Sequence, residues 1–257
     1  MSDQRRSSNL RKETSARYSH APHFTECMQL VFDEVCAIVP SGGRVLDVPA
    51  GNGPLGDRLR SSGYDVAQAD INDERADYVH ANMEQRLPFE DACFDAVLCL
   101  EGIEHVTTQQ QLLAELVRVT RPGGVITIST PNVSNLYSRL NFLFTGHYYQ
   151  FDPGAFGFAT PGAMLDKGHI APVSPYYLAY AMAANRAPLL SARGDRFKKK
   201  ILLPLAFLLW PVVAWNERRV ERRLSPNMRD PAAPFRGLFY NLHLYLSRSL
   251  VATFRRA

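Results

Sequence analysis

The sequence has few of the features that mark secreted or membrane-spanning proteins. Its four cysteines form no Cys-x-x-Cys pair and have no His cluster nearby, which excludes a disulfide scaffold and argues against a structural zinc site. Residues 1–17 are polar and basic and lack the apolar segment of a signal peptide. The longest apolar run, residues 201–215, contains two prolines and is shorter than the roughly 20 residues that a bilayer-spanning helix needs. We therefore expect a cytoplasmic protein.

Charge is divided unevenly along the chain. Residues 1–185 contain 14 basic and 21 acidic side chains, whereas residues 186–257 contain 15 basic and 4 acidic ones. Such a basic end favours an anionic partner, either nucleic acid or a membrane surface. Nucleic acid fits less well, because the basic residues flank apolar stretches and do not form a groove pattern with stacking aromatic side chains. We expect no nucleic acid partner.

Predicted strands and helices alternate along the first two thirds of the chain, which is typical of an α/β fold with a doubly wound, mostly parallel sheet. The expected strands cover residues 44–48, 65–69, 94–100 and 125–130, and the expected helices cover 22–38, 54–62, 108–120 and 175–186. A Pro-, Gly- and aromatic-rich stretch over 145–175 reads as a long loop or lid. We expect three parts: a polar leader over 1–20, the α/β domain over 21–195, and a basic, apolar, helical extension over 196–257.

The segment VLDVPAGNGPLG joins a buried strand to a helix through a loop of small residues. Gly51, Gly53 and Gly56 satisfy the spacing of a dinucleotide-binding loop, and Asp70 stands where an acid that binds ribose is expected. Alone, this pattern favours a nicotinamide-dependent dehydrogenase. Asp47 argues against that interpretation, because its charge would repel a diphosphate but suits a ligand carrying an ammonium group or a sulfonium.

Further segments follow in a recognisable order: the strand YDVAQAD, then LPF with CFDAV, then EGIEHV, then RPGG. With VLDVPAGNG, they resemble the class I S-adenosylmethionine-dependent methyltransferases over about residues 25–185, especially the branch that modifies small molecules and surface polysaccharides. The resemblance implies the Rossmann-like fold of that family. Two positions depart from its pattern: Pro49 replaces a usual Gly, and Asn82 replaces a usual Asp.

The same resemblance implies a binding site for S-adenosyl-L-methionine. Asp70 would hold the ribose hydroxyls, and Asn82 with Met83 would bracket the adenine. The full set of residues expected to bind this cofactor is Asp47, Gly51, Gly53, Asp70, Asn82, Met83 and Leu100.

Methyl transfer from a sulfonium is an in-line displacement, so the enzyme mainly aligns the acceptor with the methyl group. A hydroxyl acceptor must also lose a proton, and a neutral histidine is suited to accept it. The candidates, in order of preference, are His169, which matches a histidine in related lids, then His147 and His105. Glu101, Glu104 and His105 could alternatively hold a divalent metal, but no remote ligand is visible in the sequence, and we expect no metal site.

The apolar run over residues 201–215 is flanked by Lys198-Lys199-Lys200 and by the arginines of residues 217–223. An apolar helix between cations is typical of a segment that lies in the interface of an anionic membrane, and Pro204 and Pro211 would kink it. A second helix is expected over residues 235–254. The alternative is that both helices pack together, or on a second subunit, as ordinary core.

These observations predict a methyltransferase that methylates oxygen on a lipid-linked glycan or another hydrophobic acceptor, such as a quinone-like lipid, at the cytoplasmic face of a membrane. A catalytically inactive adaptor that binds the cofactor and uses the C-terminal helices to bind a partner is the alternative.

Overall fold

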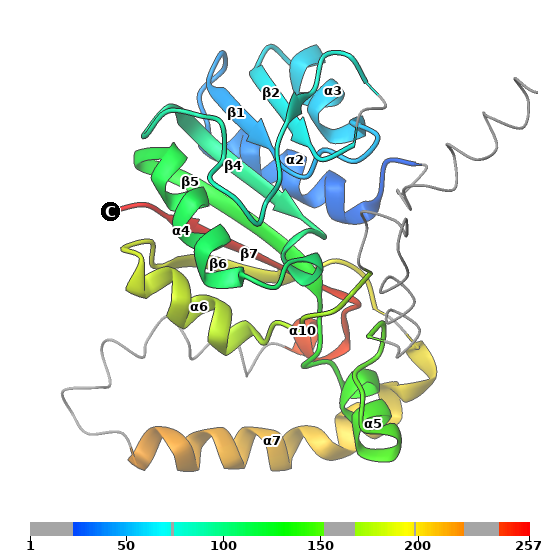
Figure 1. Cartoon of the computed structure of the whole chain (residues 1–257). Helices are drawn as coiled ribbons and strands as arrows, with labels where there is room; N and C mark the ends of the chain where they lie inside the picture. Colours follow the sequence, from blue (N-terminus) through cyan, green and yellow to red (C-terminus); the bar gives the residue numbers. More distant parts are fainter. Residues whose placement is uncertain (1–22, 73–74, 152–167, 198, 224–241) are drawn as a thin grey trace, which may run out of the picture.

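The computed structural model describes residues 23–72, 75–151, 168–197, 199–223 and 242–257 (Figure 1). Its centre is one sheet of seven strands in the order β3-β2-β1-β4-β5-β7-β6. The strands are β1 (Arg44–Asp47), β2 (Asp65–Asp70), β3 (Val79–His80), β4 (Phe94–Leu100), β5 (Thr120–Pro131), β6 (Leu189–Gly194) and β7 (Ser249–Arg255). Strands β1 to β5 pair in parallel, and β7 inserts antiparallel between β5 and β6. The expected doubly wound, mostly parallel sheet is confirmed.

Helices cover both faces of this sheet (Figure 1). The helices are α2 (Glu26–Ile38), α3 (Pro54–Ser61), α4 (Gln109–Val119), α5 (Leu136–Thr145), α6 (Pro175–Ala184), α7 (Leu203–Arg223) and α10 (Leu242–Leu246), with short 3-10 turns η1 (Ile103–His105) and η3 (Lys200–Leu202). Successive side chains of a strand point to opposite faces. On β1, Val45 packs with α2 and α3, whereas Leu46 packs with α4 and α6. Both are fully buried, so the sheet is the centre of a three-layer core.

The C-terminal residues differ from the sequence prediction. The predicted helix over 235–254 is wrong for its described part, which contains the short helix α10 followed by strand β7. Strand β7 lies inside the main sheet, so residues 249–255 belong to the α/β core and not to a separate extension that begins at residue 196. The pattern misled because a strand covered on both faces is apolar throughout and shows no alternation that distinguishes it from a buried helix.

Other expectations near the ends of the chain have mixed outcomes. Helix α7 runs from Leu203 to Arg223 as one element with Pro211 inside it, so the apolar run is helical as expected. In the described part of the chain, no helix has the length and apolar character to cross a bilayer. The leader predicted over 1–20 and most of the lid, residues 152–167, lie outside the described residues.

Candidate active site

A cavity of about 650 Å³ opens at the carboxyl ends of β1, β2 and β4, where open α/β sheets bind their ligands. Residues 48–52 after β1 and residues 81–84 line one side of it, and the start of α2 covers it. Arg196 and Arg248 line it from the segments next to β6 and β7. Strands that are distant in the chain therefore build one pocket together.

The loop after β1 is tied to the end of β2. The Gly51 amide donates a hydrogen bond of 2.8 Å to Oδ2 of Asp70, and the Asn72 amide donates one of 3.0 Å to Oδ1. Gly53 takes a left-handed conformation (φ +84°) as the N-cap of α3, and a Cβ there would lie 2.6 Å from the hydroxyl of Tyr78. Gly51 and Asp70 line the cavity, whereas Gly53 does not line it and begins helix α3 as its N-cap.

Asp47 lies at the end of β1, buried at the cavity wall. Burial, with a smaller contribution from the nearby charge of Asp70, raises the pKa of Asp47 to about 7. Nε2 of Gln68 donates to its Oδ2 at 3.5 Å and only partly offsets this. A cationic ligand group in the cavity would favour the ionised carboxylate. The site therefore suits a ligand with a positive charge better than a diphosphate.

The remaining residues expected to bind the cofactor, Asn82, Met83 and Leu100, also line the cavity. Oδ1 of Asn82 accepts a hydrogen bond of 2.9 Å from the Glu84 amide. The side-chain oxygen of Asn82 thus accepts the hydrogen bond that an Asp carboxylate could accept at this position. The substitution at this position thus keeps the local turn. The structure brings together the whole predicted set except Gly53, and their contact with a cofactor stays a prediction.

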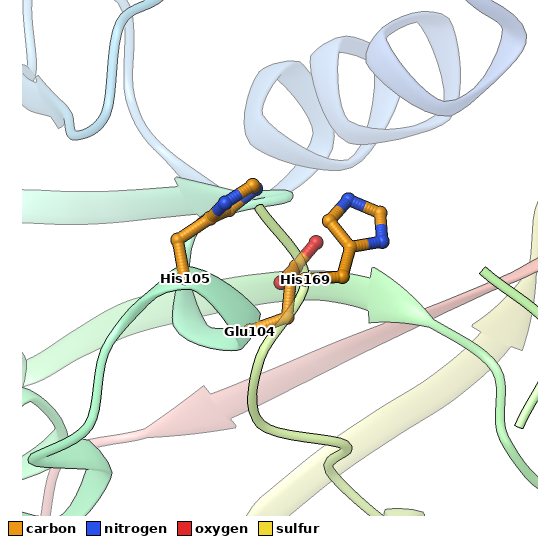
Figure 2. A group of neighbouring side chains, drawn as sticks. All are labelled: Glu104, His105 and His169. Carbon is orange, nitrogen blue, oxygen red and sulfur yellow. The ribbon is translucent and has the colours of Figure 1, made fainter. Parts of the chain in front are cut away.

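Glu104, His105 and His169 are neighbouring side chains (Figure 2). Of the three, only His105 lines the cavity. Each offers one possible ligand atom, and these atoms lie within 4.8 Å of one another. Glu104 and His105 belong to η1 after β4, and His105 lines the cavity. His169 is brought to them because the amides of Ile170 and Ala171 donate hydrogen bonds of 3.0 and 3.1 Å to the Glu104 carbonyl. His169 is the remote partner that the sequence could not reveal.

The carboxyl group of Glu104 is fully buried. Thr130 donates a hydrogen bond of 3.0 Å to its Oε2, whereas Oε1 accepts none from the described residues. Burial and the neighbouring Glu101 raise the pKa of Glu104 well above its ordinary value. The position therefore favours either a protonated carboxyl or a neutralising cation beside it.

The two other histidine candidates differ in setting. Nδ1 of His169 lies 3.0 Å from the carbonyl oxygen of Gln150. A carbonyl only accepts, so this hydrogen bond assigns the proton to Nδ1 and makes Nε2 the basic nitrogen of the neutral ring. His147 follows the end of α5 and is not part of this group, and its carbonyl accepts from Nδ2 of Asn141 at 2.8 Å. The structure therefore joins His105 and His169 but not His147.

Comparison with known proteins finds similarity in the sequence of residues 46–128 and in the fold. Residues 46–128 match the family model described as "Methyltransferase domain". The chain is 39% identical over 114 residues to the demethylmenaquinone methyltransferase of Clavibacter sepedonicus, covering 38% of this chain and 46% of that protein. It is 30% identical over 106 residues to the ubiquinone biosynthesis O-methyltransferase of Aromatoleum aromaticum, covering 36% of this chain and 45% of that protein. The chain thus spans about half the length of these curated relatives.

A solved S-adenosylmethionine-dependent methyltransferase from Archaeoglobus fulgidus has the same fold, with a TM-score of 0.54 and 17% identity over 89% of this chain and 94% of the other. The reported relatives carry quinone names, so they do not support the polysaccharide-modifying branch expected from the sequence. Residues 46–128 therefore match a methyltransferase-domain model, and the described residues have the fold of a solved S-adenosylmethionine-dependent methyltransferase.

Proposed function

We propose that this protein transfers a methyl group from S-adenosylmethionine to a hydroxyl oxygen of a hydrophobic, quinone-like acceptor. The observation that carries the proposal is the group formed by Glu104, His105 and His169, which meets the cavity at His105. Histidine is the side chain best suited to remove a hydroxyl proton near neutral pH. The names of the two relatives support the quinone-like class, and one of them is an O-methyltransferase.

The cofactor, when bound, supplies a sulfonium whose methyl group is open to attack by an oxygen lone pair. Asp47 faces its positively charged end, and Asp70 accepts hydrogen bonds from the ribose hydroxyls. Asn82 and Met83 enclose the adenine. Support for these roles comes from the position of all four side chains on the wall of one cavity.

Nε2 of His169 accepts the proton of the acceptor hydroxyl while the oxygen forms its bond to the methyl carbon. When bound, the cofactor would supply this methyl group and would keep the electron pair of its broken carbon–sulfur bond on sulfur. His105, whose ring lies against His169, orients the acceptor from the cavity wall. The hydrogen bond between His169 and Gln150 holds the ring in the tautomer that this role needs.

A second candidate role for the same group is binding of a divalent cation. The three possible ligand atoms lie within 4.8 Å, and Oε1 of Glu104 is buried without a hydrogen bond from any described residue. Two imidazoles and a carboxylate suit Zn²⁺ or Mn²⁺. Such an ion would supply Lewis-acid chemistry to the acceptor hydroxyl.

The test is transfer of a labelled methyl group to a catechol-type hydroquinone with a short isoprenoid tail. The proposal expects labelled ether product from the wild type and a loss of about 100-fold in the His169→Asn variant, with binding of S-adenosylhomocysteine unchanged. Cofactor binding without transfer to hydroxylated quinols would favour the adaptor instead. Titration with Mn²⁺ and Zn²⁺, repeated on the Glu104→Gln variant, separates the two roles of the group. Tight metal binding that is lost in the variant would show that the group holds a cation. Absence of metal binding by the wild type would favour proton transfer by His169.

A further inference from the structure

The outward side of α7 is apolar along its first half. Pro204, Phe207, Leu208, Pro211, Val212 and Trp215 recur at helical spacing, and all are exposed. The opposite side of the same helix is also apolar and packs through Ala206, Leu209 and Trp210 against Leu136, Tyr245 and Leu246. A surface helix normally turns a polar side to water. Here one side of the helix packs on the protein, so that packing does not explain why the outward side is also apolar.

The end of α5 adds a second exposed apolar group. Phe142, Leu143 and Phe144 are 46%, 72% and 80% exposed. Leu140 of α5 belongs to the same packed cluster as Leu205 and Leu209 of α7, so the two helices form one unit (Figure 1). We call the exposed apolar residues of this unit and of the adjoining turn η3 the α5–α7 surface: Phe142, Leu143, Phe144, Ile201, Phe207, Leu208, Val212 and Trp215.

Cations stand at both ends of the apolar half of α7 and no acid lies between them, whereas Glu217 and Glu221 alternate with the arginines that follow it. Residues 196–216 contain four basic and no acidic residues, and residues 130–151 contain one basic and no acidic residue. Lys199 and Lys200 are exposed just before the apolar half of α7, and Arg218 and Arg219 are exposed just after it. Nζ of Lys199 lies 5.4 Å from the ring centroid of Tyr137, and Cζ of Arg219 lies 5.6 Å from the ring centroid of Trp215.

We infer that the α5–α7 surface binds an anionic lipid bilayer, with the apolar side chains inserted at the headgroup boundary and the cations at the phosphates. A helix with apolar side chains on one side, flanked by Lys and Arg and carrying a Trp, has the composition of an interfacial helix. A second copy of the chain is a poorer occupant, because two such faces would bring like charges together. The absence of a spanning helix among the described residues is consistent with attachment from one side.

The position of this surface relative to the cavity gives the attachment a consequence. Arg196 lines the cavity and stands close in sequence before Lys199, where the chain enters η3 and α7. Helix α5 follows directly from the end of β5, beside the same carboxyl edge of the sheet. Bilayer binding would therefore hold the cavity near the lipid surface. Lipid binding itself is independent of the proposed function, whereas entry of a membrane-dissolved acceptor rests on it.

The experiment is flotation of the full chain with vesicles of phosphatidylcholine alone or with 30% phosphatidylglycerol added. We expect at least tenfold more bound protein on the anionic vesicles, with the difference reduced at high salt. Two variants test the two components: Phe207→Ser with Leu208→Ser and Val212→Ser for the apolar side, and Lys199→Glu with Lys200→Glu for the charge. Each should lower binding at least fivefold.

The matched control is Tyr176→Ser with Tyr180→Ser on α6, where the two rings are also exposed. This variant should bind vesicles like the wild type. Binding of S-adenosylhomocysteine by every variant checks that the fold persists and keeps the result separate from acceptor turnover. Equal recovery of the wild type on both vesicle types, or no recovery, would overturn the inference. So would a dimer in solution that the serine substitutions on α7 dissociate.

Discussion

The rings of His105 and His169 lie edge to face, with their centroids 4.9 Å apart. One follows β4 and the other precedes α6, and the backbone hydrogen bonds from residues 170 and 171 to Glu104 fix the approach. This pair makes the histidine variants the most informative test of the chemistry.

Replacing His169 by Asn removes the proposed base but keeps a polar side chain of similar width. We expect the methyl transfer rate to fall about 100-fold, since general-base catalysis contributes a factor of that order or more. His147→Asn is the control, because His147 is not part of the group formed by Glu104, His105 and His169, and we expect a change below about threefold. Comparable losses in both variants would show that the lid as a whole, and not the histidine pair, limits the reaction.

Asp47 should make the stability of the ligand-free protein depend on pH. Its pKa rises from 3.8 to about 7 on folding. Between those values the folded state holds a proton that the unfolded state releases, so the free energy of unfolding falls as pH rises, by at most about 1.4 kcal/mol per pH unit for one group. Asp47→Asn should therefore be more stable than wild type at pH 7.5 and lose this advantage towards pH 4. Urea unfolding of both proteins at several pH values measures the difference, and parallel pH curves would refute it.

The same carboxyl should couple cofactor binding to proton release. If Asp47 faces the ammonium group of S-adenosylhomocysteine, binding needs its ionised form. Affinity should rise with pH below about 7, up to about tenfold per pH unit, and level off above it. Calorimetry in buffers of different ionisation enthalpy counts the released protons. The Asp47→Asn variant should bind more weakly and without this pH dependence.

Position 53 requires glycine for two reasons: its φ is positive, and there is no space for a Cβ. Gly53→Ala would place a methyl group against Tyr78 and the Gln68 amide, at a backbone φ of +84°. Gly123→Ala is a matched control, because its φ is +79° and no atom lies within 4 Å of the added methyl. We expect both changes to destabilise by about 1 kcal/mol for the backbone, and Gly53→Ala by about 1–3 kcal/mol more for the clash. Equal melting temperatures of the Gly53→Ala and Gly123→Ala variants would show that the loop accommodates the added methyl group without loss of stability.

Much of the α/β core could be predicted from the sequence, because strands, helices and glycine loops there follow strong local rules. The strand Phe94–Leu100 is confirmed to the residue, and α2 and α4 within a few residues. Strand β3, only two residues long, was missed because so short a strand leaves no pattern. Strand β7 was predicted as a helix because burial on both faces removes its alternation.

The candidate site also has a part that could be predicted from the sequence and a part that could not. The gathering of Asp47 and Asp70 at one cavity could be predicted, because both stand at the ends of strands in contiguous motifs. Their contact with a cofactor stays a prediction. The group at the acceptor end depends on a tertiary contact, His169 against Glu104 and His105, which no local spacing encodes. The sequence supplied the candidates, but only the fold could select among them.

The central claim is that this cavity binds the methyltransferase cofactor, and calorimetric titration with S-adenosylhomocysteine tests it most directly. Three proteins are compared: wild type, Asp70→Ala, and Asp65→Ala, whose side chain at the other end of β2 is 71% exposed. We predict micromolar binding by the wild type, unchanged binding by Asp65→Ala, and binding about 10- to 100-fold weaker in Asp70→Ala, since hydrogen bonds to a charged group are lost. Absence of binding by folded wild type, or equal binding by all three proteins, would contradict the account.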